Sequence, residues 1–296
     1  MSEFLAKIAV TNEDRPSRSG YDQTHNPPQV RQIAAGDGWN VSDVICTAGP
    51  RDQPFEEQHS NPSIAIVVEG TFQYRCPAGR GLMMPGAFLL GNAGESFTCG
   101  HEHGAGDRCV SFSYNPHFFD GLSREAGGRT RFKVPRLPPI RPLAPLAATA
   151  ATLLAGGDQI AWEQLAIQVA AQAVQVEAGI DLPPSDAQPS SLARVTRVVR
   201  MIEHEPDMCA DLSGLARIAR LSPYHFLRTF ERLTGTTPHQ YVVRMRLRRA
   251  SIRLRLETTR ISDIALDCGF GDISNFNRAF RAEFGISPRK YRYTTP

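Results

Sequence analysis

An internal repeat of fifty residues near the C-terminus constrains this chain more than any other feature. Six residues of one segment recur in the same order at that offset, and the pairs are Phe226/Phe276, Arg228/Arg278, Phe230/Phe280, Gly235/Gly285, Pro238/Pro288 and Tyr241/Tyr291. Self-similarity at one fixed period indicates a supersecondary unit that occurs twice. The sequence therefore predicts a C-terminal domain built from two similar units.

Each unit has the pattern of two helices joined by a tight turn. Asp211, Ser222 and Asp272 precede apolar helical stripes and are expected to be N-cap residues. In the second helix of each unit, large apolar residues recur three or four positions apart, at Phe226, Phe230 and Leu233 and at Phe276, Phe280 and Phe284. This spacing places them on one buried face. A helix pair of this kind, with a polar front that contains Arg and Asn, is typical of a helix-turn-helix reader of DNA.

Residues 240–257, between the two units, have the pattern of one continuous helix. A helix of about 18 residues is roughly 27 Å long, which is comparable with the ~34 Å between successive major-groove faces. We therefore expect a spacer that places both units on one side of a duplex. Its arginines are divided between faces and are interpreted mostly as solvated or phosphate-contacting; they are Arg244, Arg246, Arg248, Arg249, Arg253 and Arg255.

The charge of the chain is segregated between its two parts. Residues 1–190 carry 14 Lys and Arg against 20 Asp and Glu, whereas residues 191–296 carry 19 against 10. The C-terminal part therefore has a net charge of +9, and all but one of its cations are arginine. Arginine suits the recognition of phosphates and base edges, because its planar fork matches both. A solvated basic surface would have the same composition, so charge alone leaves both interpretations open.

Residues 211–292 resemble the DNA-binding domain of the AraC/XylS family of bacterial transcriptional regulators. The resemblance rests on LARIARLSPYHFLRTFERLTGTTPHQYVVRMRLRRA and on ISDIALDCGFGDISNFNRAFRAEFGISPRKYR. It implies an activator or a repressor of transcription that contacts double-stranded DNA and RNA polymerase. The base-reading positions of the family fall on Tyr224, Leu227, Arg228, Ser274, Asn277 and Arg278. Leu227 departs from the polar residues often found at its position.

The residues expected to contact DNA extend over the polar faces of both second helices. In the first unit they are Tyr224, His225, Leu227, Arg228 and Arg232, and in the second unit they are Ser274, Asn275, Asn277, Arg278 and Arg281. Arginine can donate two hydrogen bonds to guanine, asparagine can pair with adenine, and apolar atoms can contact the thymine methyl group. Asn275 has an alternative role at the helix N-terminus.

The N-terminal part has the pattern of a β-rich domain. Short β-branched or aromatic runs bounded by Gly, Pro and Asn occupy residues 63–114, which favours a sandwich or barrel. Alanine-rich helices are expected at 143–154 and 159–178. The predicted fold class is α+β, with a cupin-like sensing barrel (1–135), a helical hairpin (136–180), a linker (181–191) and the double helix-turn-helix domain (192–296). The family resemblance implies that the barrel binds an effector and that the hairpin forms a homodimer, although the hairpin can also pack within one chain.

The segment TCGHEHGAGDRC contains the candidate effector chemistry of the N-terminal part. On a strand, Cys99, His101 and His103 would face one side, and Cys109 could return opposite them. Thiolate and imidazole ligands suit zinc or another transition metal, and thiols beside histidine can also act as redox sensors. The alternatives are buried structural cysteines and a pocket for a small organic effector.

Two enzyme classes are alternatives to a regulator. A DNA-repair protein that accepts methyl groups on a zinc-held cysteine needs two close cysteine pairs, which this chain lacks. A cupin-type metalloenzyme fused to a DNA-binding module needs a complete His/Glu metal motif, which is also missing. We therefore predict no enzymatic activity. The N-terminus has no signal-peptide pattern and no run approaches ~20 apolar residues, so a cytoplasmic protein without a membrane span is expected.

Overall fold

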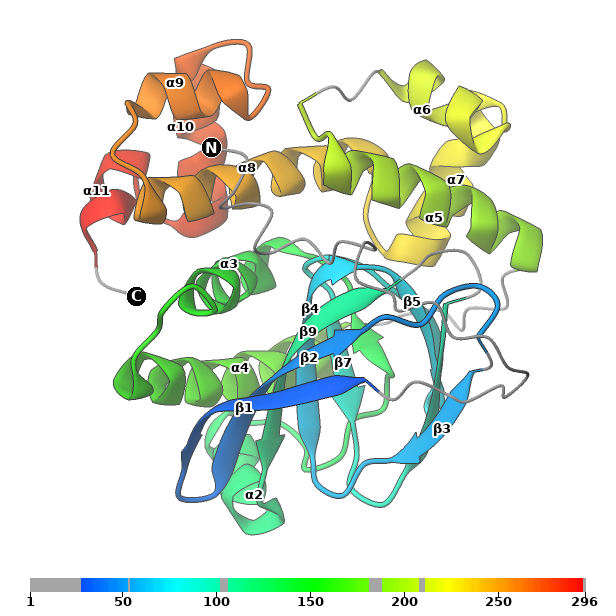
Figure 1. Ribbon diagram of the computed structural model, residues 1–296, viewed down its shortest axis with the longest axis vertical. Helices are drawn as coiled ribbons and strands as arrows, with labels where there is room; N and C mark the ends of the chain where they lie inside the picture. Colours follow the sequence, from blue (N-terminus) through cyan, green and yellow to red (C-terminus); the bar gives the residue numbers. More distant parts are fainter. Residues whose placement is uncertain (1–27, 53, 102–105, 181–187, 208–210, 295–296) are drawn as a thin grey trace, which may run out of the picture.

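The computed structural model describes residues 28–52, 54–101, 106–180, 188–207 and 211–294. Within these residues a β-rich N-terminal part lies against an all-helical C-terminal part (Figure 1). No helix among them is long and apolar enough to cross a membrane.

The N-terminal strands form two antiparallel sheets. The first has the order β1-β2-β9-β4-β7-β10, and the second has the order β3-β8-β5-β6. The strands are β1 (Gln29–Gly36), β2 (Trp39–Cys46), β3 (Phe55–Gln58), β4 (Ser63–Gly70), β5 (Phe72–Cys76), β6 (Gly79–Met83), β7 (Phe88–Gly91), β8 (Ser96–Gly100), β9 (Asp107–Tyr114) and β10 (Arg136–Leu137). Because no described strand of one sheet pairs with a strand of the other, the predicted single barrel is corrected to two separate sheets.

Strand β4 shows why the apolar run at residues 64–68 is continuous. Ile64 and Ile66 belong to a core shared with the helices that follow the sheets. Ala65 and Val67, which alternate with them, belong to a core that contains residues of the second sheet. Successive side chains of a strand point to opposite faces, so a strand covered on both faces is apolar at every position.

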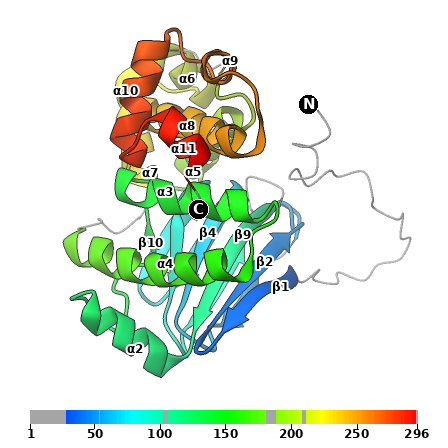
Figure 2. The same ribbon diagram turned by 90° about the vertical axis from the view of Figure 1, so that its left-hand side faces the viewer.

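A helical layer covers the outer face of the six-stranded sheet, as Figure 2 shows. It comprises α3 (Ala144–Leu153) and α4 (Gln159–Gly179), with α2 (Pro116–Glu125) and the short 3-10 helix η1 (Arg141–Leu143) beside them. Trp162, Leu165 and Val169 of α4 are buried in the shared core, and the Tyr114 hydroxyl donates to the carbonyl of Ala166 at 2.8 Å. The predicted helical pair therefore packs within this chain through its apolar residues.

The C-terminal part consists of two helical units at the two ends of the long helix α8 (Figure 1). Its helices are α5 (Pro189–His204), α6 (Leu212–Ala219), α7 (Pro223–Thr234), α8 (Pro238–Leu256), α9 (Ile261–Asp267), α10 (Ile273–Phe284) and α11 (Pro288–Tyr293). The N-cap predictions are confirmed, because Asp211, Ser222 and Asp272 each accept the backbone N–H three residues later. Of the expected linker, residues 181–187 lie outside the described residues, and residues 189–191 begin α5.

Buried arginine joins the two parts. Arg136 of β10 is 5% exposed and donates to the carbonyl oxygens of Leu233 and Thr234 at 2.8 and 3.4 Å. These carbonyls end α7, where the helix dipole favours a cation. Arg141 forms an ion pair with Glu283 at 3.6 Å, near the end of α10. The N-terminal part therefore contacts the C-terminal ends of both α7 and α10.

A second polar contact connects α5 and α8 to the end of β4. Glu203 accepts the backbone N–H of Gly70 at 2.7 Å, and Arg248 donates to the carbonyl of Val68 at 2.9 Å. In the described structure, Oε2 of Glu69, Oε2 of Glu203 and Nε of Arg248 are buried without hydrogen-bond partners. Buried polar atoms of this kind are costly, so this part of the interface depends on the charge state of its carboxyl groups.

Glu69→Gln should make the stability of the protein less sensitive to pH. Burial and the charge of Glu203, partly offset by Arg108, His204 and Arg248, raise the pKa of Glu69 to about 7. The folded state then holds this proton more tightly than the unfolded state, so the free energy of unfolding falls as pH rises from about 5 to 8. We expect the variant to melt about 2–4 °C above the wild type at pH 8 and to lose the advantage at pH 5.

Thermal unfolding of both proteins at several pH values measures this difference. Glu125→Gln, on the exposed surface of α2, is the control and should not alter the pH dependence. A constant difference between Glu69→Gln and the wild type from pH 5 to 8 would contradict the interpretation.

Candidate functional site

The first candidate surface is the polar face of α7. Phe226 and Phe230 are fully buried on its opposite face, which leaves Tyr224 64% exposed and Arg228 exposed. The Arg228 Nη1 atom donates to the Tyr224 hydroxyl at 3.1 Å, and its guanidinium carbon lies 5.8 Å from the centre of the Tyr224 ring. The tyrosine in the first turn therefore holds the arginine one turn later along the solvent face of the helix.

The polar face of α10 repeats this plan with other residues. Phe276 and Phe280 are fully buried, and the Arg278 Nη2 atom donates to Asn275 Oδ1 at 3.1 Å. The backbone N–H of Asn275 is bound by the N-cap Asp272 at 2.7 Å, so its side chain is left to hold Arg278. In both units a polar side chain near the helix start orients an exposed arginine one turn later.

The structure brings the ten predicted DNA-contacting residues onto these two faces. Nine of them are exposed, and they are Tyr224, His225, Arg228, Arg232, Ser274, Asn275, Asn277, Arg278 and Arg281. Leu227 is half-buried. A hollow on α10 is lined by Asn277, Arg278, Arg281 and Ala282. The two faces thus present hydrogen-bond donors to the solvent without neighbouring protein over them, as far as the described residues extend.

The interpretation of the α8 arginines as mostly solvated or phosphate-contacting is wrong. None of the six is an exposed residue, and each has a partner inside the protein. The partners are Glu283 for Arg244, the carbonyls of Pro206 and Gly269 for Arg246, Val68 for Arg248, Asp207 for Arg249, Glu257 and Asp267 for Arg253, and the Tyr291 ring for Arg255. Helix α8 has protein on most sides, so its arginines act as internal donors that join the surrounding segments.

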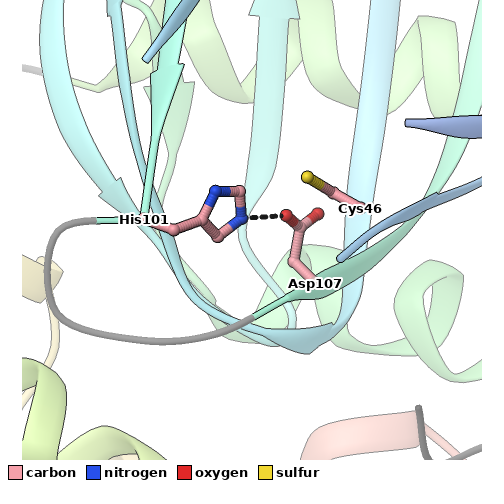
Figure 3. Close-up of side chains that lie close together, drawn as sticks. All are labelled: Cys46, His101 and Asp107. Atoms are coloured by element: carbon pink, nitrogen blue, oxygen red, sulfur yellow. Dashed lines mark hydrogen bonds and ion pairs between the residues drawn. The ribbon is translucent and has the colours of Figure 1, made fainter. Parts of the chain in front are cut away.

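A second candidate site lies at one end of the two sheets, where Cys46, His101 and Asp107 meet (Figure 3). Potential metal-ligand atoms of the three residues lie within 4.8 Å of one another, and all three residues are buried. Cys46 ends β2 and pairs with Asp107 at the start of β9, while His101 follows β8 of the other sheet. His101 Nε2 lies 2.6 Å from Asp107 Oδ1. Sulfur, nitrogen and oxygen atoms therefore converge from both sheets.

The ionisable groups around this cluster are strongly perturbed. Burial lowers the pKa of His101, but hydrogen bonds to Asp107 and Cys46 outweigh it and bring this pKa to about 9. Burial also raises the pKa of Cys99 and of Cys109 well above that of a free thiol, and Asp107 adds to both shifts. Reactive redox-sensing thiols have lowered pKa values, so the electrostatics of Cys99 and Cys109 oppose the redox-sensor alternative.

The cluster overlaps only partly with the ligand set predicted from sequence. His101 is common to both, and His103 lies outside the described residues. Cys99 and Cys109 are buried nearby but are not members of the cluster, although the Cys109 thiol donates to Asp107 Oδ2 at 3.3 Å. Sequence reasoning missed Cys46 and Asp107. Asp107 lies within the same histidine-containing motif, between His103 and Cys109, and could have been included, whereas nothing local to Cys46 signals its pairing with β9.

The comparisons with known proteins concern mainly the C-terminal part. A family model described as a helix-turn-helix domain matches residues 215–294. The chain is 35% identical over 95 residues to the transposon Tn10 TetD protein of Escherichia coli, covering 32% of this chain and 69% of TetD. It is 34% identical over 96 residues to the transcriptional activator RhaS of Mannheimia succiniciproducens, covering 32% of this chain and 36% of RhaS.

A solved transcriptional regulator from Chromobacterium violaceum, described as containing an AraC-type DNA-binding domain, is 28% identical. The alignment covers 36% of this chain and 94% of that one, with a TM-score of 0.33. The chain spans little more than a third of the length of the first curated relatives that it matches. On the sequence relationships, the protein belongs to the AraC/XylS family of transcriptional regulators, with a C-terminal helix-turn-helix domain.

Arg253→Ala tests the internal role of the α8 arginines. Arg253 is 7% exposed and donates to Glu257 and to Asp267. Loss of charged hydrogen bonds of this kind should lower the free energy of unfolding by about 1–3 kcal/mol, measured by urea denaturation. We expect DNA affinity to keep its salt dependence where the variant is folded, because no phosphate contact is lost.

The control for this variant is Arg260→Ala, an exposed arginine before α9 that makes no side-chain cap. It should leave stability nearly unchanged. Unaltered stability of Arg253→Ala together with a smaller salt slope of DNA binding would restore the phosphate-contacting interpretation.

Proposed function

We propose that this protein is a transcriptional regulator that binds specific double-stranded DNA through α7 and α10. The observation that carries the proposal is the repeated arrangement in which an exposed arginine, Arg228 or Arg278, is oriented by a polar residue of its own recognition helix. A helix that enters the major groove reads bases with residues near its N-terminal end. Tyr224, Arg228, Asn275 and Arg278 all occupy the first two turns of their helices.

The residue types support separate roles on the two faces. Arg228 and Arg278 would donate to guanine, and Asn277 would pair with adenine. Leu227 offers apolar atoms for a thymine methyl group, because it is half-buried and has no side-chain donor. His225, Arg232, Ser274 and Arg281 flank these residues and would contact phosphates or neighbouring bases.

The net charge of +9 on residues 191–296 supports DNA as the partner. Since the α8 arginines have internal partners, the exposed part of that excess includes the arginines of α7 and α10. Phosphate contacts fix the register of a protein on the duplex, and base contacts supply the specificity. Under the proposed function, α7 and α10 therefore make both phosphate contacts and base contacts.

The proposed function also includes an effector, protein partners and a cellular location. A small-molecule or metal effector at the N-terminal part would alter DNA binding or activation, and the contacts of Arg136 and Glu203 with the helical part supply a route for it. RNA polymerase would be the partner in activation. A homodimer would use the outer face of α4, where Ile160 is 67% and Ile167 39% exposed. We propose a cytoplasmic protein with no catalytic role.

Selection of bound duplexes from a random pool, with and without metal and chelator, tests the function as a whole. It should enrich one sequence with contacts in two successive grooves. Recovery of no preferred sequence in any condition would contradict sequence-specific binding.

Arg278→Ala should weaken binding to the selected duplex by about 1–3 kcal/mol and relax the preference at one base pair, as loss of a bidentate base contact does. Titrations with the selected and an unrelated duplex at one salt concentration measure both effects. Arg129→Ala, an exposed arginine of the N-terminal part, is the control and should bind like the wild type. Equal weakening on both duplexes would show that Arg278 contacts only a phosphate.

A further inference from the structure

The cluster of Cys46, His101 and Asp107 has a donor set that is selective for certain cations. It offers one thiol sulfur, one imidazole nitrogen and carboxylate oxygen. Calcium and magnesium are bound by oxygen ligands alone, whereas cysteine and histidine together favour zinc and related transition metals. The composition of the cluster therefore points away from hard cations.

The geometry of the cluster is compact enough for one ion. Bonds of about 2.0–2.3 Å from zinc to oxygen, nitrogen and sulfur place the ligand atoms of a tetrahedral site roughly 3.4–3.7 Å apart. The ligand atoms here lie within 4.8 Å of one another, and His101 Nε2 is 2.6 Å from Asp107 Oδ1. The sulfur of Cys46 lies on the side of this hydrogen-bonded pair, so an ion would take the place of the His101–Asp107 hydrogen bond (Figure 3).

The surroundings hold the ligand groups in place. Cys46 and His101 are each 4% exposed, and Asp107 is 7% exposed. The Cys109 thiol donates to the second carboxylate oxygen of Asp107 at 3.3 Å, as groups around metal sites do when they orient a ligand. Cys46 and Asp107 are directly paired across β2 and β9, so their side chains start from a fixed backbone.

We propose that Cys46, His101 and Asp107 bind a transition-metal ion of the zinc type through Sγ, an imidazole nitrogen and a carboxylate oxygen. Three protein ligands leave one position of a tetrahedral ion open. The competing interpretation is a simple ion pair between His101 and Asp107. The two differ at Cys46, which is a ligand in the first and unnecessary in the second.

The position of the site gives the ion a route to the helical part, and this step rests on the proposed function. Asp107 is the register partner of Gly70 in β4, and a Cβ atom at Gly70 would lie 2.7 Å from the Asp107 Cα, so the two backbones are in close contact. The N–H of Gly70 is bound by Glu203 of α5. A shift of Asp107 on metal binding would therefore reach α5 through one strand pair and one hydrogen bond.

The test is titration of the reduced, metal-free full chain with cobalt(II), followed by absorption spectroscopy. We expect about one ion per chain, visible-region bands of a tetrahedral site and a near-ultraviolet band from thiolate-to-cobalt charge transfer. Cys46→Ser should remove the charge-transfer band and weaken cobalt binding more than about tenfold, and His101→Gln should weaken it similarly. Cys76→Ser, a half-buried cysteine of β5 outside the cluster, is the control and should bind like the wild type.

Two results would overturn the assignment: no cobalt uptake by the wild-type chain, or uptake that Cys46→Ser leaves unaltered. Loss of the charge-transfer band in Cys99→Ser but not in Cys46→Ser would transfer the site to the ligand set predicted from sequence. Thermal unfolding of each metal-free variant checks that it is folded, and His101→Gln gives a second test if Cys46→Ser is not. Since DNA is absent from the titration, its outcome is independent of the DNA-binding proposal.

Discussion

The structure of the C-terminal part depends on the internal hydrogen bonding of the α8 arginines. Arg246 donates to the carbonyls of Pro206 and Gly269, so one side chain joins the segment after α5 to the turn after α9. Arg253 joins the end of α8 to Asp267 of α9. Hydrogen bonds from charged donors are among the stronger ones in proteins, and here they connect α8 to the segments around it. The arginines of this helix therefore have structural roles, whereas Arg228 of α7 and Arg278 of α10 stay exposed.

The parts of the fold that sequence predicted are those set by local pattern. The spacing of Phe276 and Phe280, together with the cap residue Asp272, determines which face of α10 is buried and where the helix begins. The exposure of Arg278 follows from the same periodicity. The β-branched run of β4 predicted a strand in the same way. In each case the information lies within one helix or strand and the residues beside it.

The parts that sequence could not predict depend on pairing between distant segments. Cys46 meets Asp107 only because β2 lies beside β9, and the order of strands in the sheets does not follow from the alternation of any one strand. The partners of Arg246 are backbone carbonyls far along the chain, and a carbonyl has no signature in the sequence. For this reason the arginines of α8 could be assigned to the wrong environment while those of α7 and α10 were placed correctly.

The same strand pairing relates the two candidate sites to each other. The end of β4 contacts Asp107 on one side and α5 on the other, through Gly70. Arg136 and Arg141, in the segment that leaves the sheet, contact the C-terminal ends of α7 and α10. Under the proposed function, coupling between a ligand at the sheets and α7 or α10 would run through these contacts, which lie away from Arg228 and Arg278. Coupling of this kind requires that the ligand bind one arrangement of the two parts more tightly than another. The carboxyl groups of Glu69 and Glu203, each with one buried oxygen that lacks a hydrogen bond, make the arrangement described here energetically costly at this contact.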